Sequence, residues 1–201
     1  MVLARRGDLA AAAPMAEWAE RVAREITDAQ AAATAFPPAA LTSLGRGNPG
    51  RAVSLLFELE RTPNVRSDPI YVSFLPEAVR TALASGDPEL AARLAERVEP
   101  VYPLHEHALI TVRALLAEHR AEYADAEALF ADAVKRWERF EMPWEQGQAL
   151  LGHGRCLLAL GRVPEVTESL RTAREIFTRL GAKPALSEVD ALLARATALS
   201  S

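Results

Sequence analysis

The sequence has a single cysteine, Cys156, among its 201 residues. One cysteine excludes an internal disulfide framework and is typical of proteins of a reducing compartment, so we expect a cytoplasmic location. The sequence also lacks a run of about 20 predominantly apolar residues, the length that a membrane-spanning helix needs. Its longest apolar stretches are shorter and carry Arg, Glu or Gly. We therefore expect no membrane association.

An excess of positive charge is missing too. The formal net charge is -4, from 23 basic and 27 acidic residues, which disfavours a protein that coats nucleic acid. A phosphate-binding loop is absent, because the glycine-rich stretch 45–50 has neither the preceding strand nor the following lysine that such a loop requires. We interpret that stretch as a turn between helices, and we expect no cofactor and no nucleic-acid partner.

Signals for β-strands are absent. Long runs of β-branched residues in alternation do not occur, whereas Ala, Leu, Glu and Arg, all strong helix formers, dominate. Between residues 121 and 140 the apolar positions recur in steps of three and four, which is the pattern of one helix face. The sequence therefore predicts an all-α fold.

An internal repeat organises the helices. Small residues that precede a helix start recur at spacings of 40, 39, 35 and 40, at Gly7, Gly47, Gly86, Ala121 and Gly161. Five residues after these markers stand Ala12, Ala52, Ala91, Ala126 and Val166, and seven before the last four stand Ala40, Val79, Ala114 and Gly154. The pattern predicts a repeated helix–turn–helix unit, in which the marker adopts positive φ and a small residue lets the two helices approach closely.

This unit resembles the tetratricopeptide repeat (TPR). The best copy comprises Leu150, Gly154, Leu157, Gly161, Val166, Leu170 and Ala173. The resemblance implies one TPR-like domain over 1–201, a right-handed superhelix of antiparallel helix pairs. We expect a partial unit at 1–25, units at 26–62, 68–101, 103–141 and 143–181, and a capping helix at 184–199. Because the array starts in the middle of a unit, we expect either a piece of a longer protein or a degenerate capping helix.

Three stretches carry a finer resemblance. Residues 75–94, 152–162 and 173–184 look like the C-terminal helical repeats of large bacterial signalling proteins. Those proteins combine a nucleotide-cyclase or transcription-factor module with an AAA-type ATPase and TPRs. The resemblance implies a regulatory interaction region for signal transduction, without cyclase or ATPase chemistry in this chain.

Local signals set the helix boundaries. We expect helices near 9–25, 50–60, 69–84, 88–99, 104–120, 122–140, 143–159, 163–180 and 185–198. Asp28 is a plausible N-cap for the helix that follows it. Pro37 and Pro38 should interrupt that helix, because proline removes a backbone donor and clashes with the preceding turn.

The few residues whose side chains could act in catalysis or bind a metal do not form a catalytic pattern. His105 and His107 diverge around a helix, so they would not share a metal ion. His153 and Cys156 lie three apart, but a structural zinc site needs four ligands and a nucleophilic cysteine needs a base and an exposed setting. We expect Trp18, Trp137 and Trp144 to pack in the core or between repeats, because Trp137 aligns with Phe177 across one repeat. Trp144 follows Pro143 at a connection, so partial exposure is the alternative for this side chain. The chain is therefore not expected to be an enzyme.

The residues that could bind a partner follow from the repeat alignment, which places the first helix of each pair on the concave face. The candidate groove residues are Arg80, Glu118, His119, Gln148, Arg155, Leu115, Leu151 and Leu158. Such a mixed surface suits a protein or peptide partner. We expect a non-catalytic interaction or regulatory module; the alternative is a sensor domain that binds a peptide or small effector in this groove.

Overall fold

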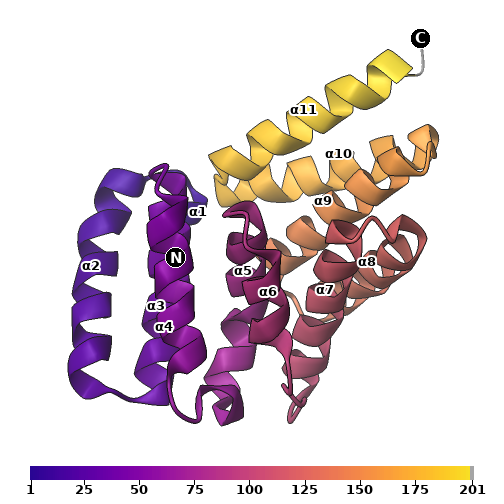
Figure 1. Ribbon diagram of the computed structural model, residues 1–201. Coiled ribbons are helices and arrows are strands. Elements are labelled where there is room, and N and C mark those ends of the chain that lie inside the picture. The colour runs from indigo at the N-terminus through magenta and orange to yellow at the C-terminus, as the bar shows by residue number, and fades with distance from the viewer. Residues whose placement is uncertain (200–201) are drawn as a thin grey trace. The chain divides into compact units, whose positions relative to one another are not determined.

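The computed structural model describes residues 1–199 and is helical throughout, with no strand among them (Figure 1). The helices are α1 (Val2–Arg5), α2 (Leu9–Ile26), α3 (Ala29–Gly45), α4 (Pro49–Arg61), α5 (Pro69–Ala84), α6 (Pro88–Ala95), α7 (Pro103–His119), α8 (Tyr123–Arg139), α9 (Pro143–Ala159), α10 (Val163–Leu180) and α11 (Lys183–Leu199), with a short 3-10 turn at Val65–Ser67. The all-α class is confirmed. The helices form two compact units, Met1–Val112 and the part from Arg113 onward.

The turn at each repeat marker has the same backbone geometry. The marker has positive φ in all five turns, from 59° at Ala121 to 84° at Gly86. The residue after the marker donates its N–H to the carbonyl five residues earlier; the pairs are Asp8–Leu3, Asn48–Ser43, Asp87–Ala82, Glu122–Ala117 and Arg162–Leu157. This is the Schellman closure of a helix C-terminus. The predicted repeat is therefore present in the hydrogen bonds of the backbone.

Ala121 is the one marker among these five that is not glycine. A side chain in the left-handed region costs about 1 kcal/mol. We expect Ala121→Gly to raise the free energy of unfolding by about 0.5–1 kcal/mol in chemical denaturation. The matched control is Ala128→Gly on an exposed helical position of α8, which should lower it by about 1 kcal/mol. Equal effects of the two substitutions would contradict the assigned turn.

Several helices begin at a residue whose side chain caps the helix N-terminus. Asp28 accepts hydrogen bonds from the N–H groups of Gln30 and Ala31, at 2.9 and 3.1 Å, as predicted. The predicted helix at 88–99 is too long, because α6 ends at Ala95. The chain leaves the helix there, with Glu96 extended and Arg97 at a φ of 56°.

The predicted interruption at Pro37 and Pro38 is wrong, since α3 continues through both prolines to Gly45. Helix α3 packs against α2, α4 and α5, and most of its side chains are buried. A proline inside a helix costs about 3 kcal/mol. Burial on several sides offsets that cost here, because tertiary packing supplies most of the stability of a protein helix.

The interior of each pair is built from the predicted small and large positions. Ala52, Ala91, Ala126, Val166 and Ala173 are fully buried. Helices α9, α10 and α11 enclose a core cluster around Leu157, Leu170, Phe177 and Val189. Glycines on α9 allow side chains of the neighbouring helix to approach its backbone closely. A Cβ atom built at Gly154 would lie 2.5 Å from Cδ2 of Leu170. This contact is the close approach that the repeat pattern predicts.

Candidate functional site

Part of the predicted groove forms an ion-pair cluster in the second unit. Arg155 on α9 donates from Nε and Nη2 to the two carboxylate oxygens of Glu118 on α7, at 2.5 and 2.8 Å. Its Nη1 donates to Oε1 of Glu188 on α11, at 2.8 Å. Burial alone would lower the pKa of Arg155, but the hydrogen bonds and charges of Glu118 and Glu188 outweigh it and raise that pKa. The guanidinium is therefore engaged within the fold.

Glu188 was not among the predicted groove residues, because the sequence suggested only a solvating cap for its helix. Glu188 lies 33 residues after Arg155, and Glu118 lies 37 before it. Both separations are close to one repeat. The repeat spacing is thus the signal that could have placed all three residues on successive first helices.

The apolar groove candidates are less accessible than expected. Leu115 and Leu151 are buried, with 6% and 1% of their surface exposed, so the expectation that they offer contact area to a ligand is wrong. Leu151 belongs to the core cluster of α9–α11, and Leu158 packs against that cluster while half-buried. Helix α11 contributes Val189 and Leu192 to the cluster that buries Leu151. Gln148 is half-buried, and His119 is exposed.

Arg80 lies in the first unit, in a buried charged cluster. Arg5 on α1 donates from Nε and Nη2 to Oε2 of Glu77 on α5, at 2.9 and 2.6 Å. Nε of Arg80 lies 3.6 Å from Oε1 of the same carboxylate. Burial alone would raise the pKa of Glu77, but the charges and hydrogen bonds of Arg80 and Arg5 lower it overall. The cluster ties α1 to α5.

Two of the four histidines, His105 and His153, are held by neighbours within the fold. In the first unit, Nδ1 of His105 accepts the Val101 N–H at 3.1 Å. In the second, Nε2 of His153 lies 2.9 Å from Oε1 of Glu127, and its Nδ1 lies 3.2 Å from Oγ of Ser169. Ser169 Oγ also donates to the carbonyl of Leu150, at 3.0 Å. Among residues 1–199, no group of three or more His, Cys, Asp or Glu side chains is arranged to hold a metal ion.

Cys156 is fully buried, and burial raises its pKa to about 12. The thiolate is the reactive form of cysteine. We therefore expect the native protein to react with a disulfide reagent at pH 8 at least 100-fold more slowly than the same protein in denaturant. Release of the coloured thiolate product measures both rates. A native rate close to the denatured rate would show that the thiol is accessible.

The expectation that all three tryptophans pack internally is wrong for Trp18. Trp137 is buried, and Trp144 packs edge-on against Phe177 with ring centroids 5.6 Å apart. Trp18 on α2 is 61% exposed, and on the same helix Met15 and Ile26 are 63% and 56% exposed. The spacing of Met15, Trp18, Val22 and Ile26 is three or four residues, so they form one stripe along α2. The sequence pattern does not reveal this stripe, because α2 also has a face of alanines, among them the buried Ala12 and Ala23.

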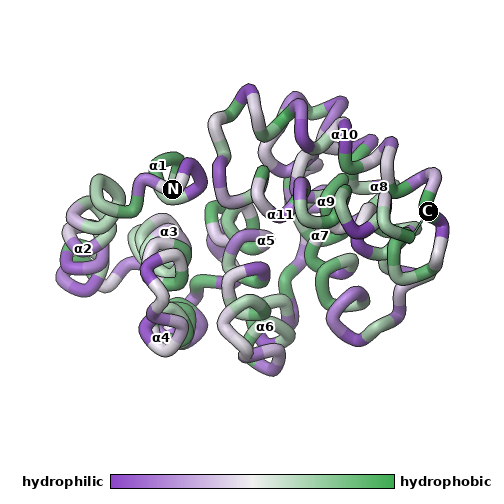
Figure 2. Tube along the Cα trace, turned by 90° about the horizontal axis from the view of Figure 1, so that it is seen from above, coloured by the Kyte–Doolittle hydropathy of each residue, from purple (hydrophilic) through white to green (hydrophobic). Residues whose placement is uncertain are grey.

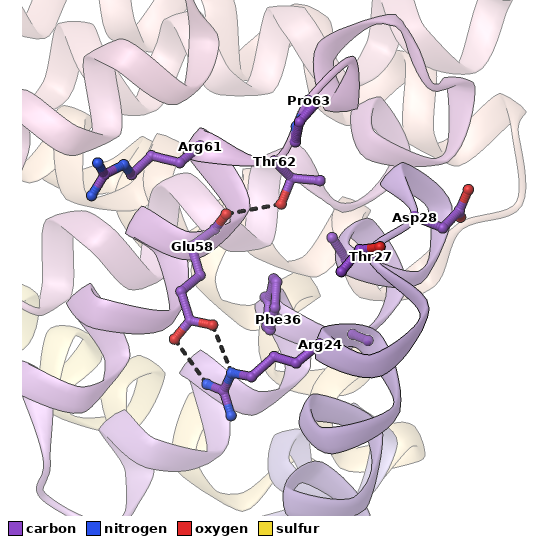
Figure 3. A pocket seen from close by; sticks show the side chains of 10 residues that line it. Arg24, Thr27, Asp28, Phe36, Glu58, Arg61, Thr62 and Pro63 are labelled. Atoms are coloured by element: carbon purple, nitrogen blue, oxygen red, sulfur yellow. Dashed lines mark hydrogen bonds and ion pairs between the residues drawn. The ribbon is translucent and has the colours of Figure 1, made fainter.

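Of the hollows that border α2 in the first unit, two are lined mainly by apolar surface. One of about 340 Å³ lies near the end of α2, where Arg24 reaches Glu58 on α4 with two hydrogen bonds of 2.7 and 2.8 Å (Figure 3). The Arg24 guanidinium also lies over the ring of Phe36, 5.9 Å from its centroid. The larger hollow, of about 650 Å³, lies between α1, α2 and α3 and includes Met15 and Trp18. The exposed apolar stripe therefore borders a concave surface.

No protein-family model matches the sequence, and no curated protein matches it. Within residues 1–199, none of the helices combines the length and apolar character needed to cross a bilayer. A solved structure, the crystal structure of BtubC (BKLC) from P. vanneervenii, is similar to this chain with a TM-score of 0.55 and 15% identity. The similarity covers 96% of this chain and 89% of that one. At this identity the likeness concerns the helical fold, and a shared fold does not imply a shared function.

Proposed function

We propose that this chain is a non-catalytic interaction module that binds a polypeptide partner. Its helix pairs would stack as a TPR-like, right-handed superhelix, in keeping with the five recurring turns. The regulatory role and the cytoplasmic setting are part of the proposal, and they rest on the resemblance to the helical repeats of bacterial signalling proteins.

The observation that carries the proposal is the apolar stripe of α2. Large apolar side chains that are more than half exposed stand beside a hollow of about 650 Å³. Tryptophan and methionine are enriched at protein interfaces, and a tryptophan that fills a partner's pocket is a common energetic hot spot. Exposed large apolar side chains gathered on one helix face are typical of a docking surface.

The charged clusters support binding rather than catalysis. Cys156 is buried, and His153 and Arg155 each have carboxylate partners within their own unit. A nucleophile or general base must reach a substrate, and these groups are directed at neighbouring helices instead.

The test is affinity purification of the tagged chain from its source cells, followed by titration calorimetry with each purified co-eluting protein. We expect a defined complex and no turnover of either component. The sensor alternative is tested beside it by thermal shift with peptides and small metabolites, because a ligand that binds the folded state raises Tm. A small ligand that raises Tm, together with no protein complex, would favour the sensor and contradict the proposal.

A further inference from the structure

Another hollow beside α2 is lined mainly by polar side chains. It has a volume of about 420 Å³ and lies between α2, α3 and α4. Figure 2 shows these three helices nearly end-on, and α3 packs against both of the others. Pockets for small molecules have volumes of about 300–1,000 Å³. The hollow is therefore large enough for a small metabolite, and its lining favours a polar one.

A buried carboxylate of α2 lines this hollow with one of its oxygens unpaired. Glu20 is 2% exposed, and its Oε2 accepts hydrogen bonds from Nη2 of Arg51 at 2.8 Å and from Nη1 of Arg24 at 3.5 Å. Its Oε1 accepts no hydrogen bond from residues 1–199, and those residues do not seal it off. Buried polar atoms are nearly always hydrogen-bonded, because an unpaired one keeps its desolvation cost. Oε1 of Glu20 is thus an acceptor that a donor in the hollow would satisfy.

A serine of α3 adds a second such group. Ser43 lines the same hollow and is 7% exposed. Within residues 1–199 its hydroxyl has no hydrogen-bond partner, and it is not sealed off either. The neighbouring Thr42 shows the usual arrangement on a helix, because its Oγ1 donates to the Pro38 carbonyl at 2.7 Å. A serine hydroxyl both donates and accepts, so Ser43 can serve either kind of ligand group.

Two arginines bring positive charge to the lining. Nη1 of Arg46 lies 3.6 Å from Oε1 of Glu17, which is longer than a hydrogen bond, and both side chains are more than half exposed. Asn48 and Arg51 stand at the N-terminus of α4, where the helix dipole favours a negative group. Since the lining holds two glutamates and two arginines, it has no net charge. The hollow therefore suits a ligand that carries both a positive and a negative group.

A hollow of the second unit provides a contrast. His153 and Ser169 line it, and its volume is about 320 Å³. The ring nitrogens of His153 lie within hydrogen-bond distance of Glu127 and Ser169, and Ser169 Oγ donates to the Leu150 carbonyl. The fold itself satisfies these polar groups, whereas it leaves Oε1 of Glu20 and Oγ of Ser43 for another molecule.

We infer that the hollow between α2, α3 and α4 binds a free amino acid. The ammonium group of this ligand donates to Oε1 of Glu20 and to Oγ of Ser43, and its carboxylate accepts from the guanidinium of Arg46. An inorganic anion would face the two glutamates, and a simple amine would offer nothing to the arginines. The site goes beyond the proposed polypeptide binding, and none of its lining residues belongs to the groove predicted from the sequence.

The test is a thermal shift of the full chain with the common α-amino acids, one at a time, followed by titration calorimetry with the one that raises Tm most. We expect at least one amino acid to raise Tm and to bind saturably. Its N-acetyl derivative lacks the ammonium group, and its amide lacks the carboxylate. Each derivative should bind at least tenfold more weakly, because each loses hydrogen bonds that involve a charged group.

Two variants remove the proposed contacts without breaking a buried ion pair. We expect Arg46→Gln to weaken binding at least tenfold, and Ser43→Ala to raise Kd as well. The matched control is Arg61→Gln, which changes an exposed arginine that lines the neighbouring hollow near Arg24 and should leave Kd unchanged. Circular dichroism and Tm without ligand check that the variants are folded.

No rise in Tm with any amino acid would mean that solvent alone serves Glu20 and Ser43, and would overturn the inference. Wild-type affinity in Arg46→Gln, or equal binding of the N-acetyl derivative, would also overturn it. Loss of binding in Arg61→Gln would place the ligand in the neighbouring hollow and contradict the assigned site. The proposed polypeptide binding is tested separately, with the partner from affinity purification, and stands or fails independently of these results.

Discussion

Gly152→Ala is expected to lower the free energy of unfolding by about 3 kcal/mol, the upper end of the range for overpacking a filled core. A Cβ atom at this position would lie 2.4–2.7 Å from three ring carbons of Phe130. Phe130 is fully buried on α8, so its rigid ring has no open space to move into. Helix α9 would have to move away from α8. Chemical denaturation followed by circular dichroism measures the loss.

Two other glycines provide graded controls. At Gly154 the nearest atom is Cδ2 of Leu170, the end of a flexible side chain, so Gly154→Ala should cost less, about 1–2 kcal/mol. At Gly50, in the first turn of α4, a Cβ atom meets nothing within 4 Å. Gly50→Ala should therefore stabilise the protein by up to about 1 kcal/mol. An equal midpoint of denaturation for all three variants would contradict the packing between α8 and α9.

These glycines show which helix–helix contacts can be predicted from the sequence and which cannot. Gly154 was predictable because it occupies the small position of the repeat, seven residues before Gly161. Gly152 lies outside that pattern, and its role depends on which helix packs on the other face of α9. A repeat alignment predicts the contact within a pair, because both partners belong to the same unit. The contact with α8, the preceding second helix, depends on a stacking geometry that one sequence does not contain.

The same distinction explains the errors at the candidate site. The repeat register correctly brought Glu118 and Arg155 onto neighbouring first helices, where they pair. It could not distinguish a groove-facing leucine from one covered by the next first helix, so Leu151 was assigned to the surface. Pro37 and Pro38 led to a wrong interruption because local propensity is weaker than burial on several sides. The exposed stripe of α2 becomes visible only in the fold, where Met15, Trp18 and Ile26 are each more than half exposed.

Glu77→Gln is expected to lower the free energy of unfolding by about 3 kcal/mol at pH 7, because removing the charge leaves two guanidinium groups, those of Arg5 and Arg80, without their shared carboxylate. Glu77 is 4% exposed, so water does not replace the lost interaction. The control is Glu122→Gln, which removes an ion pair with Arg120 between exposed side chains and should have a much smaller effect.

The difference in the free energy of unfolding between the wild type and Glu77→Gln should also depend on pH, which gives a second measurement. The pKa of Glu77 is lower in the folded state than its ordinary value of 4.5, so the folded protein binds fewer protons at this site than the unfolded chain does. The stabilisation that ionised Glu77 contributes to the folded state is therefore complete above about pH 4.5. It is lost as the pH falls through the lowered pKa of the folded state. The gap between the wild type and Glu77→Gln should be constant from pH 7 to pH 5 and narrow below pH 4.5. A gap that widens in acid would mean that burial, rather than the two arginines, determines the ionisation of Glu77, and α1 would then not be held to α5 by charge.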